Sequence, residues 1–200
     1  MNDIKQALAA ARNRKTPSGE LNEAYRQFPS NVQLGQLLAK HPNTPADILV
    51  EVGSRHPVEL VKNPGFQLLF LEKPEFWNDL DRHAIGAICS MSQVPRVVVD
   101  LLLKDQDASR RKLLVENHSG LGLNDLRHLA ADPDEEVRVA VAKHANTPPD
   151  ALQSLHNDRS PRVRIALLND RTPEALLAQM ASDSDSGVRS WVAWYTRTPE

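Results

Sequence analysis

The chain has 200 residues with 24 basic and 26 acidic side chains, so a formal net charge of −2 provides no global field to hold a polyanion nonspecifically. Hydrophobic residues make up 40% of the chain and aromatic residues only 4%, and there are 14 prolines against 8 glycines. This composition excludes a collagen, a disulfide scaffold and a disordered chain, and the frequent prolines favour many short helices. The single cysteine, Cys89, excludes an internal disulfide and a cysteine-built metal or iron–sulfur cage.

The N-terminal residues predict a short amphipathic helix. No run in the chain approaches the roughly 18 to 20 apolar residues of a membrane span, and Asp3 and Lys5 flank only a short apolar stretch, so we expect neither a signal peptide nor an anchor. We interpret residues 1–16 as a capping helix. Contact with an anionic membrane is the alternative, but the apolar face is small and mostly alanine. That face consists of Ile4, Leu8 and Ala11.

The sequence repeats itself with a period of about 26 residues. Thr-Pro dipeptides open several of the units, and five anchors in the second half of the chain are spaced by 26, 27, 25 and 26 residues. We expect each threonine hydroxyl to cap free backbone donors of a helix whose first residue is the proline. The anchors are Pro95, Leu121, Pro148, Pro173 and Pro199. The Thr-Pro pairs are Thr16-Pro17, Thr44-Pro45, Thr147-Pro148, Thr172-Pro173 and Thr198-Pro199.

Each unit is predicted to contain two helices. Apolar residues three, four and seven positions after the proline form the stripe of a first helix. They are Ile48, Leu49 and Val52; Val98, Val99 and Leu102; Ala151, Leu152 and Leu155; and Leu176, Leu177 and Met180. The predicted inner stripe of the second helix is Val137, Ala140 and Val141; Val163, Ala166 and Leu167; and Val188, Trp191 and Val192.

An aspartate precedes an arginine by six residues in four successive units. Arginine forks bind carboxylates and phosphates well, so this pattern could mark an anion or substrate site. We favour a structural interpretation, because a function rarely needs the same pair four times. In it, the aspartate satisfies backbone amides at a helix start, and the arginine ties that loop to its own or the neighbouring unit. The pairs are Asp105 and Arg111, Asp132 and Arg138, Asp158 and Arg164, and Asp183 and Arg189. The second helices are predicted to start at Asp107, Asp134, Ser160 and Asp185.

The string Asp-Pro-Asp-Glu-Glu-Val-Arg from Asp132 to Arg138, with the segment that follows it to Asp150, resembles the repeat of the leucine-rich repeat variant family, which is akin to HEAT-like repeats. The resemblance is strong over residues 105–200, clear at 34–52 and weak between them. It implies an all-α, right-handed solenoid of about seven repeats, with alternating longer and shorter helices, the shorter ones often 3₁₀ in character. Some members carry a cysteine-rich iron–sulfur module, which a chain with one cysteine lacks, so we expect no cofactor and no metal.

Two aromatic clusters interrupt the repeat. The first falls in the divergent residues 55–92 and either lines a partner groove or fills the core at a bend, and we favour the core. The second lies near residue 195 and either docks on a partner or a second copy of the chain, or folds over the last unit as a cap, and we favour the cap. The candidate partner-binding residues are therefore Phe66, Phe70, Phe76, Trp77, Trp191, Trp194 and Tyr195.

No catalytic constellation is found in the sequence. The seven histidines form no His-Glu-x-x-His pair, and His41 and His144 occupy equivalent turns before Asn-Thr-Pro, where a structural role is expected. Residues 109–112 match a Ser-x-x-Lys spacing without its companion motifs, and residues 120–122 form a Gly-x-Gly with no strand before it. Cys89 lies in an apolar run and is predicted to be a core residue.

We therefore expect a single helical-repeat domain over residues 1–200, with its regular repeats at 93–200. The predicted function is a non-catalytic, cytoplasmic scaffold that binds a protein or peptide along one face. The alternative is a HEAT-like nucleic-acid-binding module or DNA base-excision enzyme, which would need a continuous basic strip rather than a mixed or apolar one. The basic residues for such a strip are Arg110, Arg111, Lys112, Arg159, Arg162 and Arg164.

Overall fold

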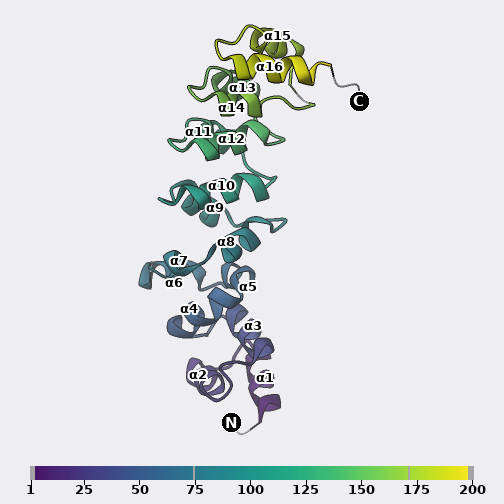
Figure 1. The fold of residues 1–200 in the computed structure, drawn as a ribbon. Coiled ribbons are helices and arrows are strands. Elements are labelled where there is room, and N and C mark those ends of the chain that lie inside the picture. Colours follow the sequence, from purple (N-terminus) through teal and green to yellow (C-terminus); the bar gives the residue numbers. More distant parts are fainter. Residues whose placement is uncertain (1–2, 74, 171, 198–200) are drawn as a thin grey trace. The chain divides into compact units, whose positions relative to one another are not determined.

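The computed structural model describes residues 3–73, 75–170 and 172–197 (Figure 1). All the regular secondary structure in these ranges is α-helical, with sixteen helices. The all-α prediction is confirmed, whereas the 3₁₀ character expected for the shorter helices is wrong for these residues. None of the described helices is long and apolar enough to cross a lipid bilayer. The Thr198-Pro199 pair lies outside the described residues.

The chain divides into two compact units, residues 1–98 (unit 1) and 99–200 (unit 2), with the division inside α9 (Arg96–Leu103). The helices of unit 1 before α9 are α1 (Ile4–Arg12), α2 (Ser18–Gln27), α3 (Val32–Lys40), α4 (Ala46–Arg55), α5 (Pro57–Val61), α6 (Phe66–Glu72), α7 (Phe76–Asp79) and α8 (Arg82–Cys89). The helices of unit 2 after α9 are α10 (Ala108–Asn117), α11 (Leu123–Ala130), α12 (Glu135–Lys143), α13 (Pro149–His156), α14 (Pro161–Ala166), α15 (Glu174–Met180) and α16 (Ser186–Tyr195).

Unit 2 consists of helix pairs stacked in layers (Figure 1). One row of successive contacts runs through α10, α12, α14 and α16, and a second row runs through α11, α13 and α15. Within a layer, α11 packs on α12, α13 on α14 and α15 on α16. The predicted apolar stripes lie between these helices, with Val137, Val141 and Val163 fully buried. Trp191 is the exception in its stripe, because its side chain is 49% exposed.

Unit 1 has a comparable row of contacts through α1, α3, α5 and α8. Its core joins α1 to α4 through side chains such as Leu21, Leu34 and Leu38, which are fully buried. The predicted N-terminal helix is present as α1 and packs on α2 and α3. Cys89 is buried as predicted, and burial raises the pKa of its thiol to about 12.

The aromatic residues of the divergent segment form part of the core of unit 1. Phe66, Phe76 and Trp77 are at most 5% exposed, and Phe70 is half-buried. Phe76 packs edge-on against Phe66 at 6.0 Å between ring centroids and against Trp77 at 6.4 Å. As partner-binding candidates, Phe66, Phe76 and Trp77 are corrected to core residues, because their rings are covered by one another and by the short helices α6 and α7.

The Thr-Pro turns work differently from the prediction. The hydroxyl of Thr44 donates to the carbonyl of Leu38, 2.8 Å away at the end of the preceding helix, and Thr147 donates likewise to Val141 at 2.6 Å. Pro45 and Pro148 are the extended residues just before α4 and α13, which have no side-chain cap. The predicted threonine cap is therefore wrong: the hydroxyl satisfies an orphan acceptor of the previous helix rather than donors of the next one.

The predicted starts of the second helices are confirmed. Asp107, Asp134, Ser160 and Asp185 precede α10, α12, α14 and α16, and each side chain accepts a hydrogen bond from a backbone N–H in the first turn. These four caps fix where each second helix begins. The aspartate of the six-residue pattern lies two residues before each cap.

Candidate functional site

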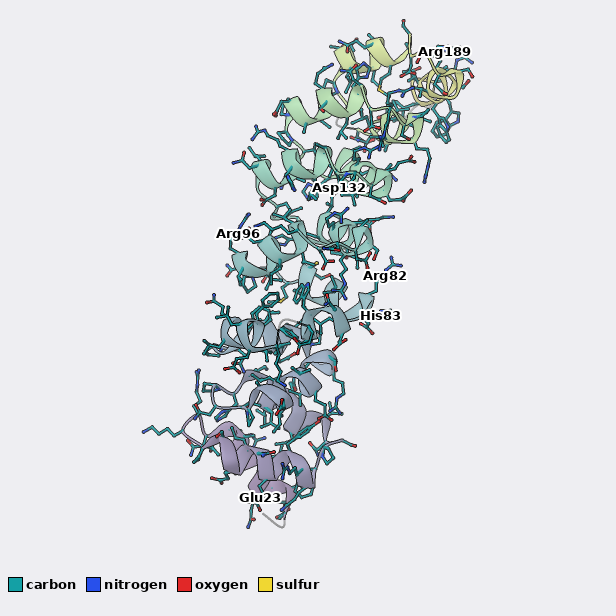
Figure 2. All side chains as sticks on the ribbon, turned by 90° about the vertical axis from the view of Figure 1, so that its left-hand side faces the viewer. Glu23, Arg82, His83, Arg96, Asp132 and Arg189 are labelled. Atoms are coloured by element: carbon teal, nitrogen blue, oxygen red, sulfur yellow. The ribbon has the colours of Figure 1, made fainter. Side chains whose placement is uncertain are left out.

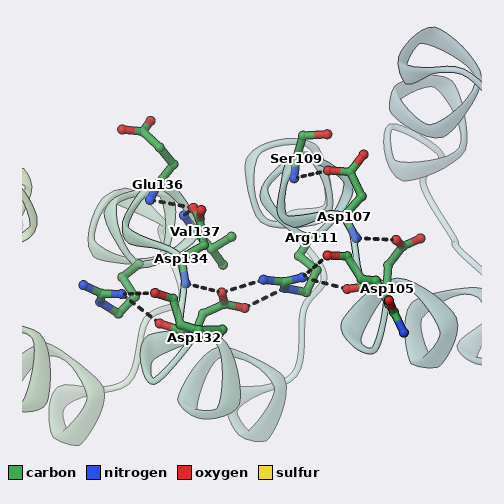
Figure 3. A network of polar contacts seen from close by, with 11 residues as sticks. Asp105, Asp107, Ser109, Arg111, Asp132, Asp134, Glu136 and Val137 are labelled. Atoms are coloured by element: carbon green, nitrogen blue, oxygen red, sulfur yellow. Dashed lines mark hydrogen bonds and ion pairs between the residues drawn. The ribbon is translucent and has the colours of Figure 1, made fainter.

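The Asp and Arg residues of the six-residue pattern connect successive layers of unit 2 (Figure 3). The Nε and Nη2 atoms of Arg111 donate to the two carboxylate oxygens of Asp132, one layer further on, at 2.7 and 2.8 Å. Its Nη1 donates to the backbone carbonyl of Asp105 in its own layer at 2.7 Å. The predicted partners are therefore both used: the backbone of the aspartate six residues earlier, and the carboxylate of the next layer's aspartate.

The same arrangement recurs twice more. Arg138 binds the Asp158 carboxylate at 2.7 and 3.1 Å, and Arg164 binds the Asp183 carboxylate with both bonds at 2.7 Å. We call each arginine with the next layer's aspartate a rung. The side chains of all three rungs are no more than 10% exposed. A bidentate pair of this kind holds both the distance and the angle between two layers.

Each rung aspartate is also a local turn residue. The carboxylate of Asp132 accepts the backbone N–H of Asp134 at 2.9 Å, and that of Asp158 accepts the N–H of Ser160 at 2.8 Å. Burial alone would raise the pKa of the Asp132 carboxyl, but the bonds from Arg111 and from the Asp134 amide outweigh it, so the pKa is lowered. These carboxylates are therefore held in the ionised form.

Histidine and asparagine turns add neutral ties between layers. The Nδ1 of His41 accepts the Asn43 N–H at 3.1 Å, which leaves a protonated Nε2 to donate to the Asn13 carbonyl at 2.9 Å. In unit 2, His144 Nδ1 accepts the Asn146 N–H in the same way, at 3.2 Å. The structural role predicted for these two histidines agrees with this geometry.

Two adjoining hollows run along the α10–α12–α14–α16 row of unit 2. The first, about 460 Å³, is lined by residues of α10 and α12 and by Arg162. The second, about 540 Å³, is lined by residues of α12, α14 and α16. They share Val139, Lys143 and Arg162 and so form one surface, which we call the inner groove. Its apolar contributors are Val115, Val139, Ala140, Ala145, Ile165, Ala166, Leu168 and Trp191.

Alternating charges lie along the inner groove. Lys112 is 3.0 Å from Glu136 in the next layer, and Glu136 is 2.7 Å from Arg162 in the layer after that. Arg162 also contacts Glu135 at 2.9 Å. The bond from Lys112, with the charges of Lys112 and Arg162, lowers the pKa of the Glu136 carboxyl. The groove is therefore mixed in charge and partly apolar, not a basic strip.

Trp191 enters the inner groove because of its place in the repeat. The equivalent positions of the two preceding layers hold Ala140 and Ala166, which are 7% and 8% exposed. An indole does not fit where those methyl groups pack, so the ring of Trp191 lies in the groove wall. Trp194 is 58% exposed and stands edge-on to Trp191 at 5.4 Å, outside both hollows, and Tyr195 is half-buried. That these rings cap the last unit stays a prediction.

The basic residues considered for nucleic-acid binding are all bonded within unit 2. Arg110 pairs with Asp105 at 3.4 Å, and Arg159 donates to the carbonyl of Pro133 at 3.4 Å. The remaining four are the members of rungs and of the groove charges described above: Arg111, Arg164, Lys112 and Arg162.

Among the described residues, no group of three or more His, Cys, Asp or Glu side chains is arranged to hold a metal ion. Comparison with known proteins finds no matching family model, no matching curated protein and no matching solved structure. The groove was not predictable from a motif, since its wall is assembled from four helices. The available signal was the placement of opposite charges about one period apart, at Lys112, Glu136 and Arg162.

Proposed function

We propose that this chain is a non-catalytic scaffold of stacked helical repeats, a right-handed solenoid of the leucine-rich repeat variant type, which binds a peptide segment of a partner protein in the inner groove. The observation that carries the proposal is the groove itself: two contiguous hollows with a partly apolar lining and Trp191 at one end. A half-exposed tryptophan beside aliphatic side chains is the kind of anchor that dominates binding energy at protein interfaces.

The charges of the groove support a peptide more than a nucleic acid. A peptide offers both carbonyl acceptors and N–H donors, and the groove offers both cations and carboxylates along its length. A polyanion, by contrast, is attracted by a surface of one sign, and Glu135 and Glu136 offset the charges of Lys112 and Arg162 along the groove. This mixed charge disfavours the nucleic-acid alternative.

Peptide display tests this proposal. Peptides that bind the full chain are selected from a random library, and their affinities for variants of the chain are then measured. Val139→Glu places a charge on the floor where the two hollows meet, and Trp191→Ala removes the anchor without adding a charge. Leu123→Glu is the matched control, because Leu123 is a half-exposed apolar residue of α11 outside both hollows.

Selected peptides should bind Val139→Glu and Trp191→Ala at least about tenfold more weakly than the unchanged protein, and Leu123→Glu about as well as the unchanged protein. Circular dichroism spectra establish that each variant is folded. Peptides that bind all four proteins alike would place recognition elsewhere and contradict the proposal. A salt-dependent shift of a DNA duplex at roughly physiological ionic strength would favour the nucleic-acid alternative instead.

A further inference from the structure

The charges that line the inner groove are unevenly distributed along it. The residues that line only the first hollow include one cation, Lys112, and two carboxylates, Glu116 and Glu136. The charged residues that line both hollows are two cations, Lys143 and Arg162. Among the described residues, none that lines the second hollow is a carboxylate. The lining is therefore net negative toward α10 and net positive toward α16.

This gradient follows the register of the repeat. Five residues after the rung arginine, the same position holds Glu116 in α10 and Lys143 in α12. Two residues before the rung arginine, the same position holds Glu136 in α12 and Arg162 in α14. Both positions thus change from a carboxylate to a cation, one layer apart, in the direction of α16.

The larger apolar side chains of the groove lie at its positive end. Ile165, Leu168 and Trp191 line the second hollow and not the first. Trp191 lies in α16, the helix that the label of Arg189 marks in Figure 2. A ligand whose apolar side chains pack on these residues therefore has its neighbouring groups beside the two cations.

The charged groups at both ends of the gradient are accessible to a ligand. The side chain of Glu116 is 42% exposed and lies 3.7 Å from Lys112. Lys143 is exposed, and the side chain of Arg162 is 68% exposed. Arg162 contacts two carboxylates of α12 through Nη1 and Nη2. Since a guanidinium has five N–H donors, it can bind a further carboxylate while both contacts remain.

We propose that the inner groove selects its peptide by the order of charges, an inference that rests on the peptide-binding function proposed above. The ligand has apolar side chains against Ile165 and Trp191, with an acidic residue next to them. The acidic residue contacts Lys143 and Arg162, and a basic residue further along contacts Glu116. Successive helices pack roughly 8 to 10 Å apart and an extended chain rises about 3.3 Å per residue, so the basic residue lies about three positions beyond the acidic one.

The opposite order of charges is disfavoured by repulsion. A peptide with its basic residue beside the apolar ones would place a cation on Lys143 and Arg162, and its carboxylate on Glu116. Like charges brought together in an interface reject a wrong partner, and opposite charges favour the right one. A peptide with neither charge should bind with intermediate affinity.

Displayed peptide libraries of matched composition test the order. Every peptide carries a block of random apolar residues, one glutamate and one lysine, with two random uncharged residues between the charged ones. In the first library the glutamate is nearer to the apolar block, and in the second library the lysine is. The block lies at either end of the peptide, so that both chain directions are sampled. We expect the full chain to enrich the first library at least about fivefold over the second.

An exchange of charges in the protein should reverse this preference. In the double variant Glu116→Lys with Lys143→Glu, the first hollow has the more positive lining, and the second library should be enriched instead. Arg127→Asp with Asp150→Arg is the matched control, because it exchanges an exposed ion pair outside both hollows. It should keep the preference of the unchanged protein. Glu116→Gln is a milder variant that should weaken the preference without reversing it.

The outcomes distinguish the charge order from peptide binding itself. Equal enrichment of the two libraries, by peptides that bind Val139→Glu more weakly, would overturn the charge order and leave the proposed function intact. A preference that the double variant does not change would also overturn the charge order. Enrichment of neither library, or peptides that bind Val139→Glu as well as the unchanged protein, would contradict both. A sedimenting mass that rises with concentration, and falls in the double variant, would identify a second copy as the occupant and overturn the assignment to a partner's peptide.

Discussion

Unit 1 and unit 2 stack helices in similar rows, but they use different bonds between layers. In unit 2 the layers are joined by buried ion pairs, as between Arg138 and Asp158. In unit 1 a buried neutral side chain makes such a tie: Asn63 donates to the carbonyls of Ala39 and His41 at 2.8 and 3.0 Å. The bond from Asn43 to the Thr16 carbonyl is common to both units, because Asn146 donates likewise to Ser119. The same stacking can therefore be held by ionised or by neutral groups, and only the first makes stability depend on the charge of aspartates.

The difference in bonding accompanies a difference in regularity. The rungs of unit 2 repeat with nearly constant geometry, and the inner groove follows the same row of helices. Unit 1 contains the short helices α5 and α7 and an aromatic core. A bidentate pair at each layer fixes the geometry between that layer and the next.

Acid should produce the largest difference in stability between the two units. The pKa values of the Asp132, Asp158 and Asp183 carboxyls are lowered in the folded chain, so their stabilisation is present above the ordinary aspartate pKa of about 3.9 and is lost as the pH falls below it. The comparable part-buried carboxyl of unit 1 is that of Glu59, whose pKa is also lowered. We expect amide NMR signals of unit 2 to lose dispersion at a higher pH than those of unit 1.

Loss of unit 1 first, or of both units in one transition, would contradict this expectation. Glu59→Gln provides the control, because it removes the unit 1 carboxyl whose pKa is lowered and changes no rung. The order in which the two units unfold should be unchanged in it.

Removal of one rung should have the next largest effect. Asp158→Ala leaves a buried Arg138 without its carboxylate, and we expect the free energy of unfolding to fall by about 3 kcal/mol. Urea denaturation measures this change. Asp150→Ala is the matched control, since Asp150 also binds an arginine, Arg127, at 2.6 Å, but both side chains are exposed. It should leave stability nearly unchanged, and similar losses in the two variants would show that burial of the rung is immaterial.

Substitution of the turn threonines should lower stability least, and by the same amount in both units. Thr44→Val in unit 1 and Thr147→Val in unit 2 each remove one buried hydroxyl that donates to the end of the preceding helix. Each should lower the free energy of unfolding by about 1 kcal/mol, because a buried carbonyl loses its donor. Thermal denaturation of the two variants tests this. A loss confined to unit 2 would mean that its stability depends on these turns as well as on the rungs.

The sequence predicts the helices and the caps of the second helices well, because apolar spacing and capping residues are local signals. It predicts a structural role for Asp132 and Arg138, but not which aspartate each arginine binds. In a repeat, the aspartate of the same layer and that of the next layer both lie at a constant sequence distance from the arginine. The Thr-Pro turns were misassigned because threonine commonly caps the helix that follows, and the backward bond to Leu38 depends on the path of the turn.

The candidate site was predictable only in part. Trp191 was named from its aromatic character, but it was placed in an inner stripe because its helix period matches that of Ala140 and Ala166. Only the packing of neighbouring layers reveals that the ring is too large for that position. The burial of Phe76 depends likewise on contacts between α6 and α7 that no local pattern encodes.

A double-mutant cycle across one rung tests most directly whether buried ion pairs hold the layers of unit 2 together. Unfolding free energies are measured for Arg138→Gln, Asp158→Asn and the double variant, and for the same changes at the exposed pair of Arg127 and Asp150. We predict a coupling energy of at least about 1.5 kcal/mol for the buried pair and little or none for the exposed pair. Coupling that is equally small in both pairs would contradict the account.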